Sequence, residues 1–172
     1  MEKFIAMIIA VITSAFSGKP SGEPRVENVD HIKEFEALRL VAYKPTAYDV
    51  WTIGYGHTST ASKGMRITER EAEALLRADL VWVQDAIKKL VDVPLSQDQY
   101  DALASFIFNV GRGAFSASTM RRKINASDML GASKEFLRWN KQKQNGKMVV
   151  LRGLTRRRKV EQSMWLKGTK NV

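Results

Sequence analysis

Residues 35–58 read FEALRLVAYKPTAYDVWTIGYGHT, and the rest of the chain is organised around this stretch. Glu36 shares one helical face with three apolar residues that precede or adjoin it, at the spacing i, i+3, i+6 and i+7: Val29, Ile32 and Phe35. A carboxyl group among apolar neighbours resists ionisation, so we expect its pKa to rise and the group to hold a proton near neutral pH. A partly buried ion pair with Arg39 is the alternative role for Glu36.

A hairpin is expected directly after this helix. Val41–Tyr43 and Val50–Tyr55 are rich in β-branched and aromatic residues, and turn-forming residues separate them. Gly54 and Gly56 alternate along the second run, which would leave one face without side chains and open to close approach by a ligand. Ordinary strand bends at the two glycines are the alternative.

Three polar side chains around the hairpin form a candidate catalytic set. A polymer lying on the glycine face could reach Glu36, Asp49 and Thr52 together. A protonated carboxyl beside a second carboxylate is suited to general-acid cleavage of a glycosidic bond. Residues three apart on a regular strand face opposite sides, so Asp49 can join Thr52 only if the turn reorients it.

Several ordered motifs resemble one family of enzymes. Thr52–His57 reads TIGYGH, Gln99–Gly111 reads QYDALASFIFNVG, and Gly153–Glu161 reads GLTRRRKVE. In this order, and over roughly residues 28 to 166, they are similar to the tailed-phage lysozymes, the endolysins of glycoside hydrolase family 24. One difference lies in the hairpin: in the family, eight residues separate the glutamate from an aspartate or cysteine, and the residue at that position here is Pro45.

The resemblance implies roles for named residues. Glu36 would protonate the leaving sugar oxygen, and Asp49, the only acid in the loop, would stabilise the oxocarbenium-like centre or position water with Thr52. The remaining family positions are expected to bind saccharide or to hold the hairpin in place: Gly54, Gly56, Phe108 and Ser118 for the substrate, and His57 with Asp79 as a structural pair.

The implied activity is hydrolysis of the β-1,4 bond between N-acetylmuramic acid and N-acetylglucosamine in peptidoglycan, for host-cell lysis by a phage. No cofactor is expected, and the enzyme would act as a monomer. A lytic transglycosylase that uses Glu36 alone is one alternative. A basic protein that lyses membranes without catalysis is the other.

The composition limits the cofactors and binding partners that we expect for this protein. The chain has no cysteine and only two histidines, so we expect neither disulfides nor a metal site. A net charge of +10 favours a polyanionic partner. Peptidoglycan and an anionic cell-envelope surface are the preferred partners, because no nucleic-acid recognition motif is present. A solvated basic face that serves solubility is the plainer explanation.

The N-terminal segment differs in composition from the rest of the chain. Residues 4–18 are mostly apolar, follow Lys3 and precede a segment rich in Gly, Pro and Ser. The run is shorter than the ~20 residues of a stable transmembrane helix and has the length of a signal-peptide core. We expect it to tether the enzyme to the inner membrane before release, or to be cleaved as a signal, and either route leads to the host periplasm. A short helix packed on the domain is the third possibility.

The expected architecture is α+β, mainly α. Residues 1–24 form the signal or signal-anchor segment and linker, and residues 25–172 form one lysozyme-like domain. Thr68–Glu71 is a capping box that opens a long helix to about Leu90, and Ser96 caps the next helix. Shorter helices are expected over 116–124, 129–139 and 154–166, with a turn at 145–146. The resemblance implies a small lobe with the hairpin, joined by the long helix to a larger helical lobe, with a cleft between them.

Overall fold

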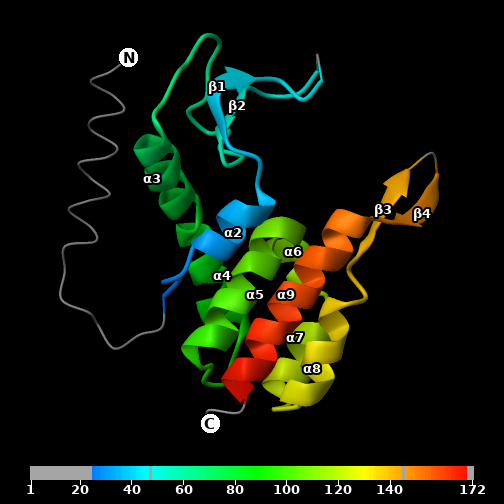
Figure 1. The fold of residues 1–172 in the computed structure, drawn as a ribbon. Helices are drawn as coiled ribbons and strands as arrows, with labels where there is room; N and C mark the ends of the chain where they lie inside the picture. The colour runs from blue at the N-terminus through cyan, green and yellow to red at the C-terminus, as the bar shows by residue number, and fades with distance from the viewer. Residues whose placement is uncertain (1–24, 47, 145, 170–172) are drawn as a thin grey trace, which may run out of the picture. The chain divides into compact units, whose positions relative to one another are not determined.

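The computed structural model describes residues 25–46, 48–144 and 146–169 (Figure 1). They divide into two compact units, the first formed by residues 32–81 and the second by residues 25–31 and 82–169. The expected N-terminal segment, 4–18, lies outside the described residues. Among the helices that the structure describes, none combines the length and apolar character needed to cross a membrane.

The first unit holds the hairpin and the helices next to it in sequence. Helix α2 (Asp30–Phe35) leads from the second unit into the first and is followed by strands β1 (Arg39–Tyr43) and β2 (Thr52–Gly54). The strands are antiparallel, with an irregular register between the two ends of β1 (Figure 1). The expected second strand, 50–55, is therefore shorter than its composition indicates, because the chain turns at Gly54.

Helix α3 (Glu69–Asp79) completes this unit. Its first turn has the expected capping box, since Thr68 and Glu71 each accept a hydrogen bond from the other's backbone N–H. Glu73 on α3 binds Lys33 of α2 and Arg77 of its own helix, at 3.0 and 2.9 Å. The bonds from Arg77 and then Lys33 lower the pKa of Glu73, which favours the carboxylate that ties α2 to α3.

The long helix expected to reach Leu90 is two helices. Helix α3 stops at Asp79, and α4 (Val81–Leu90) begins two residues later. Leu80, at the break, is only 1% exposed. Neither proline nor glycine stands at this position, so the apolar spacing of the sequence continued across the break without a signal.

The second unit is mostly helical around helix α5 (Gln97–Val110), whose N-terminus is capped by Ser96 as expected. The described part of this unit also contains α4 from Trp82 onwards, α6 (Arg112–Ser116), α7 (Thr119–Asn125), α8 (Met129–Phe136) and α9 (Arg152–Thr169). Helix α9 packs along α5, and α8 packs on both α7 and α9 (Figure 1). The helix expected over 116–124 is α7, which begins three residues later than expected because Ser118 caps its N-terminus.

The centre of the second unit is an aromatic and ionic core. Phe106 on α5 makes edge-to-face contacts with Phe136 and Trp139, with ring centroids 5.3 and 5.5 Å apart. The guanidinium of Arg158 lies 4.9 Å from the Phe106 ring centre and 2.9 Å from the Glu161 carboxylate. Burial lowers the pKa of Arg158 to about 10 and raises the pKa of Glu161. In each group the opposite charge of the partner acts against the effect of burial and favours the charged form.

A second hairpin was not anticipated from the sequence. Strands β3 (Lys141–Gln144) and β4 (Lys147–Val150) pair in regular antiparallel register between α8 and α9. The sequence indicated a turn here through Asn145-Gly146, and Gly146 has a φ of 81°. The strands themselves carry lysine and glutamine, which are not typical strand formers.

Candidate active site

Glu36 lies immediately beyond the end of α2. Its backbone N–H donates to the carbonyl of Ile32 at 3.1 Å and so closes the last turn of the helix. Ile32 is fully buried, whereas Phe35 and Glu36 are half-buried. The expectation that Glu36 is buried among apolar residues is therefore only partly met: the helix stops one residue before it, and its carboxyl retains contact with solvent.

Asp49 and Thr52 lie on either side of the start of β2. Thr52 is the first residue of that strand, is buried and pairs across the hairpin with Tyr43. Its hydroxyl donates to the carbonyl of Val50 at 3.3 Å. Asp49 is exposed in the connection, where its N–H donates to the carbonyl of Thr46 at 3.2 Å. Because Asp49 is outside the strand, the alternation of strand side chains does not apply to it.

The two glycines of the hairpin do not form an open strand face. Gly54 ends β2 with a φ of 64°, and Gly56 follows in a tight turn with a φ of 98°. Ile53 and His57 close this turn through two backbone hydrogen bonds of 2.9 Å. A Cβ built on Gly54 would lie 3.4 Å from the Cβ of Ala72, so the missing side chain allows close packing on α3. Beside Gly56 no atom lies within 4 Å of such a Cβ.

His57 fastens the hairpin to α3. Its Nδ1 lies 2.9 Å from both carboxylate oxygens of Asp79, and its ring is buried. On the other side, Nε2 accepts the backbone N–H of Thr60 at 3.3 Å and lies 2.8 Å from the Thr60 hydroxyl. Since Nε2 accepts a hydrogen bond, Nδ1 carries the hydrogen and donates it to Asp79. Both ring nitrogens of His57 are therefore engaged in hydrogen bonds that hold the hairpin in place.

The hydroxyl groups that complete this arrangement were not singled out from the sequence. Ser59 and Thr60 both lie within hydrogen-bonding distance of His57 Nε2. Their signal was present in the chain, as two hydroxyl residues two and three positions after the histidine in a short turn.

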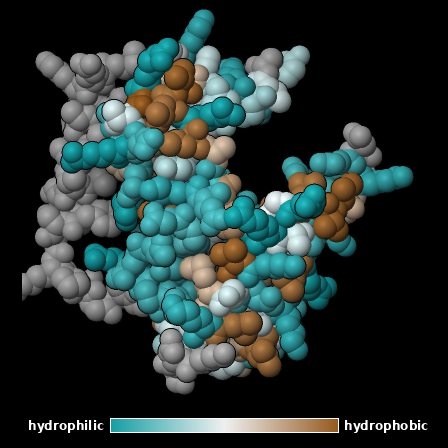
Figure 2. All heavy atoms as spheres, in the orientation of Figure 1, coloured by the Kyte–Doolittle hydropathy of each residue, from teal (hydrophilic) through white to brown (hydrophobic). Residues whose placement is uncertain are grey.

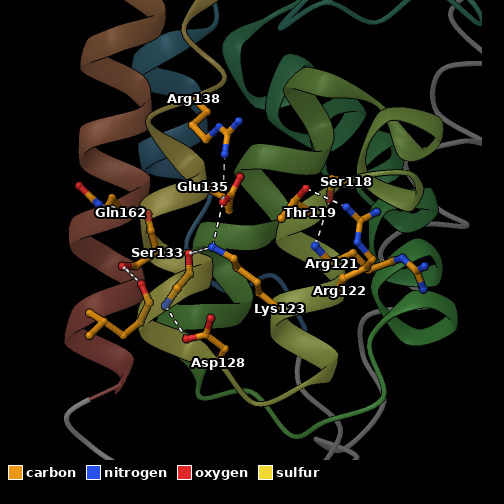
Figure 3. Close-up of polar contacts among 12 residues, drawn as sticks. Ser118, Thr119, Arg121, Arg122, Lys123, Asp128, Ser133, Glu135, Arg138 and Gln162 are labelled. Atoms are coloured by element: carbon orange, nitrogen blue, oxygen red, sulfur yellow. Dashed lines mark hydrogen bonds and ion pairs between the residues drawn. The ribbon is translucent and has the colours of Figure 1, made fainter.

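Phe108 and Ser118, the two groove candidates in the second unit, have clear structural partners. Phe108 is half-buried and stacks on Trp82 with ring centroids 6.4 Å apart. Ser118 caps α7, where its oxygen accepts the backbone N–H of Arg121 at 3.0 Å (Figure 3). Its hydroxyl hydrogen remains available for a second hydrogen bond.

Metal ligands are not grouped in the part of the chain that the structure describes. Within those residues, no three or more His, Cys, Asp or Glu side chains are arranged to hold a metal ion.

The fold is lysozyme-like. The muramidase domain of SpmX from Asticaccaulis excentricus superposes with a TM-score of 0.80 at 40% sequence identity, covering 84% of this chain and 99% of that chain. The phage lysozyme family model matches residues 33–161, which include Glu36, the β1–β2 hairpin and the first ten residues of α9. The chain belongs to the phage lysozyme family, a family of peptidoglycan-hydrolysing enzymes.

Two curated relatives place it among endolysins. The endolysin of Acyrthosiphon pisum secondary endosymbiont phage 1 is 46% identical over 134 residues, which are 78% of this chain and 91% of that protein. The SAR-endolysin of Enterobacteria phage PA-2 is 35% identical over 161 residues, 93% of this chain and 88% of that protein. The resemblance to the phage lysozymes noted in the sequence is confirmed, as is the mainly α, lysozyme-like fold.

Proposed function

We propose that this protein is an endolysin that hydrolyses the bond between N-acetylmuramic acid and N-acetylglucosamine in host peptidoglycan. The observation that carries the proposal is Glu36: a half-buried carboxyl closing a helix directly before the family hairpin, inside the region that matches the phage lysozymes. A carboxyl group at this position can serve as the proton donor of the reaction.

In this mechanism Glu36 protonates the bridging oxygen as positive charge develops on the sugar ring. Asp49 stabilises that charge or, with Thr52, positions the attacking water. Asp49 is exposed, so its carboxylate is accessible to an extended polymer. The hydroxyl of Thr52 is held in place by its hydrogen bond to the carbonyl of Val50. A separation of roughly 5–5.5 Å between the two carboxyls corresponds to retention of configuration and roughly 6.5–9.5 Å to inversion.

The test is the clearing of outer-membrane-stripped cells by the wild type and three variants. Glu36→Gln is expected to lose activity by about 100- to 10,000-fold, the range typical of a general acid. Asp49→Asn should lose a substantial part of the clearing activity. Asp85→Asn, which removes an exposed carboxylate on α4, is the matched control and should clear at the wild-type rate. Unchanged clearing by Asp49→Asn would remove that residue from the mechanism.

Product analysis separates the alternatives. Mass spectrometry of digested wall should show muramic acid at the new reducing ends. Anhydromuramic ends would indicate a transglycosylase relying on Glu36. Lysis that survives Glu36→Gln would indicate a basic membrane-lytic protein.

The enzyme is further proposed to reach the periplasm through residues 4–18, tethered to the inner membrane until release. The support is the apolar character of this segment and the alignment of a SAR-endolysin with 93% of the chain. Replacing these residues with a polar linker should move the protein from the membrane fraction to the cytosol. A wild-type protein found only in the cytosol would contradict the proposal.

A further inference from the structure

The hairpin β3–β4 presents apolar and basic side chains to solvent from both strands. Every described residue of the two strands is exposed, and three neighbours on β4 are large and apolar: Met148 at 62%, Val149 at 39% and Val150 at 54% exposure. The hairpin extends away from α8 and α9, the helices that flank it in the sequence (Figure 1). Figure 2 shows this region as a brown, apolar surface bordered by hydrophilic side chains.

The register sorts these side chains onto faces. Lys141 lies opposite Val150 and Lys143 opposite Met148. Side chains directly opposite in antiparallel strands share a face, as do residues two apart, so both pairs lie on the same side of the hairpin. That face therefore alternates lysines and apolar side chains across the two strands. Lys147 and Val149 lie on the other face with two glutamines.

Charge around the hairpin has one sign. Between Glu135 and Glu161 the chain contains no acidic residue, and seven exposed basic residues occur there: Arg138, Lys141, Lys143, Lys147, Arg152, Arg156 and Lys159. Arg157 and Arg158, in the same stretch, are buried and paired with Glu161. Of the acid-free stretches in the C-terminal half, the one that contains the hairpin has the most basic residues. A partner of opposite charge is favoured at this place.

Lysine on exposed strands also protects against edge-to-edge aggregation, which is the plainer explanation for three lysines here. That role does not account for three adjacent exposed apolar side chains, which raise the hazard that the lysines would reduce. A hydrated glycan does not account for them either. An anionic bilayer interface does, because apolar side chains enter the headgroup boundary while lysine stems extend their ammonium groups to lipid phosphates.

From this combination we infer that the β3–β4 hairpin is a docking element for the surface of an anionic phospholipid bilayer. The pairs Lys141–Val150 and Lys143–Met148 form the contact face, and Lys147 adds charge from β4. The contact is peripheral and reversible, since the two apolar side chains of this face, Met148 and Val150, bury little area and each lysine contributes roughly fivefold in affinity near an anionic surface. It is separate from the N-terminal segment and from the catalytic proposal.

The absence of cysteine from the chain permits a local readout in the full-length protein. Met148→Cys on the hairpin and Leu130→Cys on α8, which is 61% exposed, are each labelled with an environment-sensitive fluorophore. With vesicles containing phosphatidylglycerol, the label at position 148 should shift to the blue and the label at 130 should not. With phosphatidylcholine vesicles the shift at 148 should be several-fold smaller at the same lipid concentration. Because the N-terminal segment can bring the whole chain to a vesicle, the difference between the two positions is the informative quantity.

Matched lysine variants test the charge. Changing Lys141, Lys143 and Lys147 to Gln should raise the lipid concentration for half-maximal shift by roughly 10- to 100-fold. Changing the exposed Lys63, Lys89 and Lys134 to Gln removes the same amount of charge from other parts of the protein. This variant should have a lipid concentration for half-maximal shift within about twofold of the wild-type value. Equal shifts at 148 and 130, no shift at 148, or equal loss in both triple variants would each overturn the inference. A shift with isolated peptidoglycan but not with vesicles would assign the hairpin to wall binding instead. No peptidoglycan is present in the vesicle experiment, so its failure leaves the muramidase proposal unaffected.

Discussion

At the residue scale, the buried polar groups of the second unit set its dependence on pH. His31 is the second residue of α2 and is buried, and its Nε2–H donates to the carbonyl of Asp101 on α5 at 3.2 Å. Burial lowers the pKa of His31 below 6.5, and the nearby charge of Arg157 acts in the same direction. The folded protein therefore keeps His31 neutral at a pH where the unfolded chain begins to protonate it.

The sign of the effect follows from proton linkage. Below pH 6.5 the unfolded state binds more protons at this position, so the free energy of unfolding should fall as the pH drops, by at most about 1.4 kcal/mol per pH unit. Asp101 acts oppositely at lower pH, since burial raises its pKa above 3.8. We expect urea denaturation between pH 7.5 and 6.0 to show a loss of stability that is reduced in His31→Gln. His57 is present in both proteins, so an identical slope in the two would contradict this assignment.

At the element scale, two glycines of α9 offer a matched comparison. A Cβ on Gly168 would collide with the Ser96 hydroxyl oxygen and lie 3.0 Å from the backbone nitrogen of Gln99, at the N-terminus of α5. A Cβ on Gly153, in the first turn of the same helix, meets nothing within 4 Å. The C-terminal end of α9 thus approaches α5 closely enough to require glycine, whereas its N-terminal end does not.

Alanine substitutions should therefore have opposite effects on stability. Gly153→Ala is expected to raise the free energy of unfolding by up to about 1 kcal/mol, because alanine favours the helix and restricts the unfolded chain. Gly168→Ala should lower it by about 1–3 kcal/mol through overpacking, since backbone atoms of α5 cannot move aside easily. Thermal and urea denaturation of the two variants provide the measurement. A stabilised Gly168→Ala would show that the ends of α5 and α9 are more loosely packed than described.

At the scale of the whole molecule, and given the proposed function, we expect the net charge of +10 to strengthen binding to an anionic cell wall. Screening shortens the reach of exposed charges from about 14 Å at 0.05 M salt to about 4 Å at 0.5 M. Binding of the catalytically inactive Glu36→Gln protein to isolated peptidoglycan should therefore weaken several-fold over this range, as measured by co-sedimentation. Binding that does not change with salt would mean that specific saccharide contacts, rather than net charge, dominate.

Local signals in the sequence were sufficient for much of the fold. The capping boxes at Thr68 and Ser96 depend on a side chain and a backbone N–H three residues apart, so neighbouring residues determine them. The TIGYGH string and the motifs after it were sufficient to indicate the family, which the comparisons confirm. The pairing of His57 with Asp79 was indicated only through the family, because the two residues are 22 positions apart.

Other features depend on contacts that no local pattern encodes. The break at Leu80, the approach of Gly54 to Ala72 and the partial exposure of Glu36 each result from how distant segments pack. Strand β3 contains only lysine and glutamine, so strand propensity did not indicate its regular pairing with β4. The sequence by itself thus determined the family, the absence of cysteine, the basic net charge and the starts of the main helices. These features depend on short motifs, on composition, or on residues within one helical turn of each other. Only the tertiary structure decided where helices break, which glycines face a neighbour and which apolar side chains remain in solvent, since burial depends on residues far apart in the chain.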